Sequence, residues 1–134
     1  MASVPLMSDA DAPAEVRAVF DDIRAVRQTD FVNNFWRALG AADPALLRQT
    51  WERVKAVMGA PGALDPLTRE LIYVAVSTAN GCGYCVHSHT AAARAKGMTA
   101  RQHAELLAVI ALASHTNALA TALQVPVDPE FDAG

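Results

Sequence analysis

Residues 65–97 read DPLTRELIYVAVSTANGCGYCVHSHTAAARAKG, and this stretch decides the fold. Asp65-Pro66 is typical of a helix start, because aspartate caps the first turn and proline suits its first position. The next breaker is Asn80-Gly81, so residues 66–79 form one element. Its apolar run Leu71–Val76 suits a buried strand or a buried helix, but the uninterrupted length is ordinary for a helix and long for a strand. We therefore predict a helix that is apolar nearly all round.

A second helix is predicted from about Gly83 to Lys96, with Gly97 just beyond its end. Glycine is favoured there because it adopts positive φ at little steric cost. The break between the two helices, residues 79–81, is short, and a short connection predicts an antiparallel hairpin. The hairpin carries the tetrapeptide Cys82-Gly83-Tyr84-Cys85 at the start of its second helix.

The remaining sequence is also punctuated by helix signals. Gly40 closes one short segment, Asp43-Pro44 repeats the aspartate-proline start, and Thr99–Gln102 matches a capping box. Alanine makes up 28 of the 134 residues and is the best helix former but a poor strand former. We predict an all-α, single-domain bundle of about six helices over residues 1–134, with the hairpin at its centre. The expected helices cover about residues 13–28, 31–39, 44–58, 66–79, 83–96 and 99–123.

Two of the N-terminal patterns have an apolar face. In the first helix the expected buried residues are Val16, Val19, Phe20 and Ile23. In the helix that starts at Pro44 they are Leu46, Leu47, Trp51, Val54 and Met58. Most residues of each set have another member three or four residues away, which is the spacing of one helix face.

Composition and charge exclude several classes of protein. Hydrophobic residues make up 52% of the chain and charged residues 19%, so the chain is not intrinsically disordered. The net charge is −3 and basic residues do not cluster, so we expect no nucleic acid as a partner. The longest apolar run, Leu106–Ala113, is far short of the roughly 20 residues that span a bilayer, and the N-terminus carries Asp9 and Asp11. We expect a cytoplasmic protein without a membrane partner.

Residues 104–123 are apolar on more than one face. A chain of this length has little core in which to bury a second apolar face. We therefore expect a homo-oligomer whose subunits cover the excess.

Cys82 and Cys85 are the only cysteines in the chain. A pair spaced i,i+3 on the first turn of a helix is within disulfide range. The free N–H groups and the positive end of the helix dipole lower the pKa of a thiol there, and the thiolate is the reactive form. His89 is four residues after Cys85 and shares its face, so it can take the thiol proton.

Glu70 is the polar residue that stands out in the apolar helix, 12 residues before Cys82. Burial would raise the pKa of its carboxyl unless a partner compensates, and such a group suits a proton relay. In an antiparallel hairpin Glu70 meets His89 rather than Cys82 at the turn. A plainer interpretation is an ordinary acid in the first turns of a helix, where the dipole favours it.

Two other interpretations of the cysteine pair stay open. The thiols are buried structural residues in one of them. In the other, zinc is held by Cys82, Cys85 and His89 with either His87 or Glu70, although structural zinc sites usually draw ligands from two separate segments.

Glu70, the Cys82–Cys85 tetrapeptide and His89, at these spacings, resemble the core signature of the alkylhydroperoxidase D-like branch of the carboxymuconolactone decarboxylase family. Glu-x11-Cys-x2-Cys-x3-His is far more specific than a bare Cys-x2-Cys. The likeness covers about residues 44–123, which would form the core of the predicted domain.

The resemblance implies an all-α fold that assembles into trimers or hexamers. In redox members of this family the second cysteine, here Cys85, attacks the peroxide, and the first, here Cys82, resolves the sulfenate to a disulfide. Glu70 and His89 would form the proton relay. The implied activity is a thiol-dependent peroxidase or disulfide reductase of antioxidant function. Its substrate would be a hydroperoxide, its reductant a dithiol or protein, and it would need no cofactor or metal.

Tyr84 occupies a position where the best-studied members carry a histidine. From its place between the cysteines we expect Tyr84 to line the substrate pocket. Decarboxylase members of the family generally lack the cysteine pair. This difference argues against lactone decarboxylation, which is the alternative enzymatic activity. A non-enzymatic zinc-binding or oligomeric scaffold is the alternative outside catalysis.

Overall fold

The computed structural model describes residues 1–132. This part of the chain contains six α-helices, one π-helical turn and one short 3-10 turn, and within it no strand forms. The prediction of an all-α fold is therefore confirmed. The chain divides into two compact units, Met1–Pro61 and Gly62–Gly134. The single domain over residues 1–134 stays a prediction.

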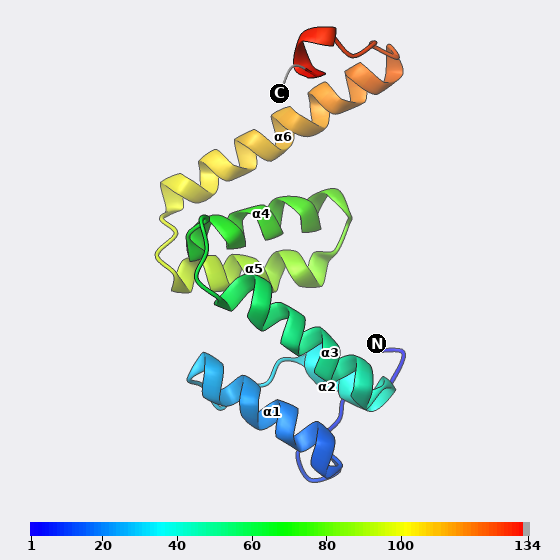
Figure 1. Ribbon diagram of the computed structural model, residues 1–134, viewed down its shortest axis with the longest axis vertical. Helices are drawn as coiled ribbons and strands as arrows, with labels where there is room; N and C mark the ends of the chain where they lie inside the picture. Colours follow the sequence, from blue (N-terminus) through cyan, green and yellow to red (C-terminus); the bar gives the residue numbers. More distant parts are fainter. Residues whose placement is uncertain (133–134) are drawn as a thin grey trace. The chain divides into compact units, whose positions relative to one another are not determined.

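The first unit contains three helices (Figure 1): α1 (Ala14–Arg27), α2 (Asn34–Ala42) and α3 (Pro44–Val54). The π-helical turn η1 (Lys55–Gly59) continues α3. The four residues expected on the inner face of α1 are all buried, which confirms that pattern. In α3 the expected stripe is only partly right, because Leu46 is 46% exposed whereas Leu47 and Trp51 are buried. The core of this unit consists of Val16, Val19, Phe20, Ile23, Val32, Trp36, Leu47 and Trp51.

Gly40 does not close a helix, contrary to the sequence prediction. It lies inside α2, where a Cβ atom would stand 3.0 Å from Cγ1 of Val16 and 3.3 Å from the ring of Phe20. Glycine is therefore needed for close packing of α2 on α1 rather than for a turn. The helix ends at Asp43, which also caps α3 by accepting hydrogen bonds from the N–H groups of Ala45 and Leu46. This shared residue shifts α2 about three residues later than predicted.

The second unit contains α4 (Pro66–Ala79), α5 (Gly83–Ala95), α6 (Ala100–Ala122) and the 3-10 turn η2 (Pro129–Asp132). Figure 1 shows α4 and α5 side by side and antiparallel, as the sequence predicts, and α6 also contacts α4. The capping box at the start of α6 forms between Thr99 and Gln102 as expected. The helices of this unit therefore match their predicted ranges within about two residues.

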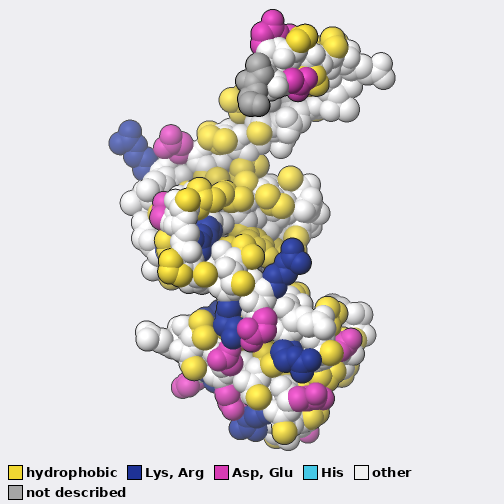
Figure 2. All heavy atoms as spheres, viewed as in Figure 1, with side chains coloured by type: hydrophobic (Ala, Val, Ile, Leu, Met, Phe, Trp, Pro, Cys, Tyr) yellow, Lys and Arg dark blue, Asp and Glu magenta, His cyan; other side chains and the backbone are white. Residues whose placement is uncertain are grey.

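Few side chains of the second unit are buried. Among its residues up to 132, the buried hydrophobic ones are Val74, Ala93 and Met98, and none of the residues of α6 is buried. Large apolar side chains on α4 and α6 face outward, and Figure 2 shows hydrophobic side chains gathered over these helices. The most exposed of them on the two helices are Ile72, Val76, Leu107, Val109, Leu112 and Leu119.

By length and composition alone, α6 would also suffice to cross a membrane. It is the one helix in residues 1–132 of which this is true, and a single helix of this kind is weak evidence for a membrane protein. The sequence prediction of no membrane partner rested on a shorter apolar run and stays a prediction.

Candidate functional site

The N-cap of α4 and the turn between α4 and α5 position the cysteine pair and the residues near it. The Asp65 carboxylate accepts a hydrogen bond of 2.9 Å from the N–H of Thr68, and Pro66 occupies the first helical position, as predicted. Beyond Asn80, Gly81 has φ of +72°, a conformation that costs glycine little. The N–H of Cys82 then donates to the carbonyl of Ser77 over 2.9 Å. These local contacts fix the direction in which α5 leaves the turn.

Cys82 and Cys85 form a disulfide, with their Cα atoms 5.3 Å apart. Cys82 is the N-cap residue of α5, and Cys85 lies in the first turn, where its N–H points to Sγ of Cys82 over 3.3 Å. The sulfur atoms therefore lie where unpaired N–H groups and the helix dipole stabilise negative charge. The structure holds the oxidised form of a pair whose spacing allows it to open and close.

His89 and Glu70 meet across the hairpin. Nδ1 of His89 lies 2.7 Å from Oε2 of Glu70, and Glu70 is only 4% exposed. Glu70 therefore meets His89, as the antiparallel hairpin predicts, rather than the cysteines at the turn. His89 is one turn after Cys85 on the same helix, so residues from α4 and α5 converge on one face.

Lys96 is the second partner of Glu70 and is a residue that the sequence reasoning missed. Its Nζ donates to Oε1 of Glu70 over 2.8 Å, from the C-cap position of α5. Lys96 is one of only two lysines in the chain. The signal available in the sequence was the hairpin itself, because an antiparallel pair brings the end of α5 beside the start of α4.

The pairing changes the expected protonation of Glu70. Burial raises the pKa of its carboxyl, but the hydrogen bonds from His89 and Lys96 and the charge of Lys96 outweigh burial. The pKa therefore lies below its ordinary value, and the expectation of a raised pKa, which held only for an unpaired carboxyl, does not apply. An ionised carboxylate only accepts hydrogen bonds, so Nδ1 of His89 carries the proton that it donates to Glu70. The other nitrogen, Nε2, is left to accept a proton.

Tyr73 completes the group on α4. Its ring stacks on the imidazole of His89, with centroids 3.6 Å apart and planes inclined by 18°. Tyr73 follows Glu70 by three residues, so both side chains project from the same face of α4. Glu70 thus holds one edge of the imidazole while Tyr73 covers one of its faces. The stacking was not predicted, since the sequence alone does not pair Tyr73 with His89.

Tyr84 and His87 lie near the cysteines in sequence. Tyr84 is 46% exposed on the first turn of α5, and its place in a substrate pocket stays a prediction. Nδ1 of His87 lies 2.9 Å from the carbonyl of Gly83, so this ring turns back along its own helix. Throughout residues 1–132 no group of three or more His, Cys, Asp or Glu side chains is placed to hold a metal ion.

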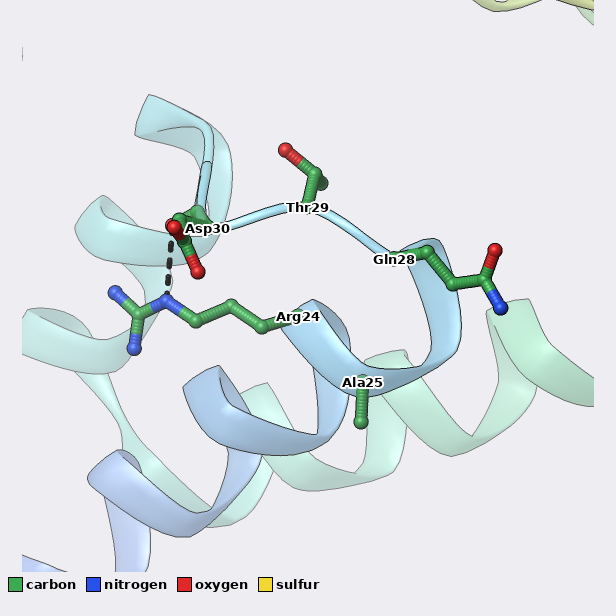
Figure 3. A pocket seen from close by; sticks show the side chains of 5 residues that line it. All are labelled: Arg24, Ala25, Gln28, Thr29 and Asp30. Carbon is green, nitrogen blue, oxygen red and sulfur yellow. Dashed lines mark hydrogen bonds between the residues drawn. The ribbon is translucent and has the colours of Figure 1, made fainter.

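A surface hollow of about 420 Å³ lies in the first unit, at the end of α1 (Figure 3). It is lined by Arg24, Ala25, Gln28, Thr29 and Asp30. Nε of Arg24 donates to the carbonyl of Asp30 over 2.9 Å, and its terminal nitrogens pair with Asp9 and Asp21. The positive charge of Arg24 is therefore paired with carboxylates of the same unit. The five residues that line the hollow do not form a cluster of reactive side chains.

Comparisons with known proteins agree with the geometry. A sequence model of the carboxymuconolactone decarboxylase family matches residues 44–128. The alkyl hydroperoxide reductase AhpD of Solibacter usitatus is 45% identical over 65 residues, which cover 48% of this chain and 35% of that protein. That of Mycobacteroides abscessus is 40% identical over 90 residues, covering 66% and 51%. The chain thus spans about a third to a half of the length of these curated relatives.

A solved structure is similar over the whole chain. It is the crystal structure of the alkylhydroperoxidase AhpD core from Rhodospirillum rubrum, which is 67% identical to this chain. The match covers 100% of this chain and 99% of that one, with a TM-score of 0.96.

Proposed function

The chain belongs to the carboxymuconolactone decarboxylase family, and we propose that it is a thiol-dependent peroxidase that reduces hydroperoxides through Cys82 and Cys85. The observation that carries the proposal is the cysteine pair at the start of α5 with the Glu70–His89 pair on the same hairpin. Relatives named as alkyl hydroperoxide reductases and a neighbour named as an alkylhydroperoxidase core support it. The cellular role would be antioxidant defence.

The first step in this proposal is attack of Cys85 on the peroxide. Nε2 of His89 takes the proton of the Cys85 thiol, and the thiolate attacks the outer oxygen of the hydroperoxide. The O–O bond breaks, Cys85 becomes a sulfenic acid, and the alkoxide that leaves takes the proton back from His89 and departs as an alcohol. Glu70 accepts a hydrogen bond from Nδ1 throughout, so it stabilises the protonated ring.

The second step closes the disulfide. The Cys82 thiol gives up its proton and its thiolate attacks the sulfur of the Cys85 sulfenic acid. The S–O bond breaks, and the hydroxide that leaves takes up that proton and departs as water. One peroxide and two thiols thus give one alcohol, one water and one disulfide. A dithiol or a protein thiol must then reduce the disulfide by exchange. The disulfide between Cys82 and Cys85 supports this step, because it is the product that the step would form.

The function is tested by following consumption of tert-butyl hydroperoxide with dithiothreitol as reductant. We expect turnover in the wild type and none in Cys85→Ser, and equal rates in the two would contradict the proposal. The thiol titre should also fall from two per chain to none after one equivalent of peroxide. Decarboxylation of a lactone that survives loss of both cysteines would favour the alternative activity. Stoichiometric zinc whose removal costs stability would favour the scaffold.

The assembly and location belong to the same proposal. We infer that the chain forms a homo-oligomer, a trimer or hexamer, in which the exposed apolar side chains of α4 and α6 are covered by other subunits. These residues lie in a unit that has only three buried hydrophobic residues of its own among those described. We place the protein in the cytoplasm, where reductants keep such a pair cycling.

A further inference from the structure

We propose that Lys96 is a positioning residue of this site. Its Nζ binds one oxygen of Glu70, and this contact keeps the other oxygen directed at Nδ1 of His89 as a hydrogen-bond acceptor. This inference rests on the proposed function for its consequence in catalysis. Its structural part rests only on the contacts among the three side chains.

The two oxygens of Glu70 have different partners. Oε1 accepts from Nζ of Lys96 over 2.8 Å, and Oε2 accepts from Nδ1 of His89 over 2.7 Å. Because Glu70 is 4% exposed, water has little access to either oxygen. A buried carboxylate needs all of its partners, so each contact restricts the torsion angles that the other can use.

The end of α5 determines where Lys96 lies. Gly97 follows it with φ of +95°, and its N–H donates to the carbonyl of Arg94 over 3.0 Å. The N–H of Met98 donates to the carbonyl of Ala93, also over 3.0 Å. This pair of bonds is the Schellman ending of a helix, and the buried Met98 anchors it. Lys96 is therefore held beside the early turns of α4 by a specific local structure.

Charge gives Lys96 a role beyond packing. Its side chain is 37% exposed and the Glu70 side chain 6%, so the cation is partly hydrated while the anion is not. Without Lys96, the buried carboxylate would keep only its contact with Nδ1 of His89 and would lose the positive charge of the lysine. Its protonation would become easier, and a protonated Glu70 can no longer hold Nδ1–H of His89 in place.

The side chains that contact Glu70, or its partner His89, lie on α4 and α5. His89 and Lys96 face Glu70 from α5, and Tyr73 lies on the same helix as Glu70, stacked on His89. On α6, Glu105 lines a hollow together with Leu71, the sequence neighbour of Glu70. Lys96 is the lysine that pairs with Glu70. A change in the pKa of Glu70 after Lys96 is replaced is therefore assigned to the loss of this pair.

The test is a titration of the Glu70 side-chain carbon by NMR, with its signal assigned through Glu70→Gln. We expect Lys96→Met to raise the pKa of Glu70 by about one, the lower end of the range for an adjacent cation. Lys96→Gln should raise the pKa of Glu70 by a similar amount, and Lys96→Arg should keep it close to that of the wild type. The matched control is Arg94→Gln, which removes a positive charge from the same last turn of α5. It should leave the pKa of Glu70 unchanged.

Activity is then measured on the same variants with tert-butyl hydroperoxide across pH. Lys96→Met should lose about tenfold in kcat/KM at acidic pH and stay within about threefold of wild type at pH 8, where Glu70 is ionised in both. An unchanged pKa of Glu70 in Lys96→Met and Lys96→Gln would overturn the inference. A raised pKa in a protein that reduces no peroxide would instead refute the proposed function and leave the role of Lys96 intact.

Discussion

Glu70 and His89, 19 residues apart in sequence, meet through a contact of 2.7 Å between Oε2 and Nδ1. The carboxylate is buried and ionised, so it selects the ring tautomer that carries a proton on Nδ1. That selection leaves Nε2 as a base on the helix that carries Cys85. One contact between two helices therefore prepares the nitrogen that the proposed reaction uses.

Cys82→Ser should stop the reaction after its first step. Without Cys82, no thiol in the chain can close the disulfide, so peroxide leaves Cys85 as a sulfenic acid. We expect one dimedone adduct per chain by mass spectrometry, located on Cys85. Cys85→Ser is the matched control and should give none. An adduct on Cys82 in that control would show that the two cysteines have the opposite roles.

Glu70→Gln should change how stability depends on pH. The pKa of Glu70 in the folded state lies below its reference value of 4.5, so its contribution is present above about pH 4.5. It is lost as the pH falls through the lowered value. At pH 7 we expect the variant to lose about 1–3 kcal/mol of unfolding free energy, because buried polar partners are left imperfectly paired. Urea denaturation measures this loss.

Below about pH 4.5 the unfolding free energies of wild type and Glu70→Gln should approach each other. Asp9 and Asp22 also have lowered pKa values, and they contribute to acid sensitivity equally in both proteins. The difference between the two curves therefore isolates Glu70. A constant difference at every pH would show that Glu70 stabilises the fold through packing rather than through charge.

Tyr73→Ala should loosen the imidazole of His89, whereas Tyr73→Phe should retain the stacking. An aromatic pair of this kind contributes about 1 kcal/mol beyond burial, so we expect Tyr73→Ala to lose stability by roughly that amount. Peroxide turnover should fall several-fold in Tyr73→Ala and stay close to wild type in Tyr73→Phe. Equal activity in all three proteins would mean that Glu70 alone orients the ring.

Gly97→Ala should destabilise the end of α5 without any steric clash. A Cβ at Gly97 would meet nothing within 4 Å, but its φ of +95° is unfavourable for alanine. We expect a loss of about 1–2 kcal/mol, visible as a decrease in Tm of a few degrees. Gly83→Ala is the matched control, since Gly83 lies in a helix and a Cβ there also meets nothing within 4 Å. A loss in the control as large as in Gly97→Ala would exclude the backbone explanation.

Leu112→Lys should weaken the proposed homo-oligomer. Leu112 is 63% exposed on α6, and a charge there cannot be buried against another subunit at low cost. Sedimentation velocity should show smaller species for this variant. Val26→Lys places the same charge on an exposed residue of α1 and should leave the assembly intact. A wild type that sediments as a monomer at micromolar concentration would contradict the proposal.

The helices were predictable because their signals are local. Asp65-Pro66, Gly81, Gly97 and the Thr99 capping box each act within one turn, and each forms as predicted. Errors arose where packing decided the outcome. Glycine is often a helix breaker, which is why the sequence predicted a helix end at Gly40. In the structure Gly40 lies inside α2, where the close approach of Val16 leaves little room for a larger residue.

The candidate site was predictable in part. The spacing of Cys82, Cys85 and His89 on one helix, and the antiparallel hairpin, together indicated that Glu70 meets His89. The position of Lys96 and the stacking of Tyr73 depend on how far α5 is shifted along α4. That shift relates residues on two different helices, so the capping and turn signals of either helix alone do not encode these two contacts.

The sequence by itself determined the helices, the turn between α4 and α5, and the placing of two thiols on one helical turn. These features depend on capping, positive φ and helical period, which act over four residues or fewer. Only the tertiary structure decided the protonation of Glu70. Burial and pairing shift its pKa in opposite directions, and the outcome depends on Lys96, 26 residues away, reaching the second oxygen of the carboxylate.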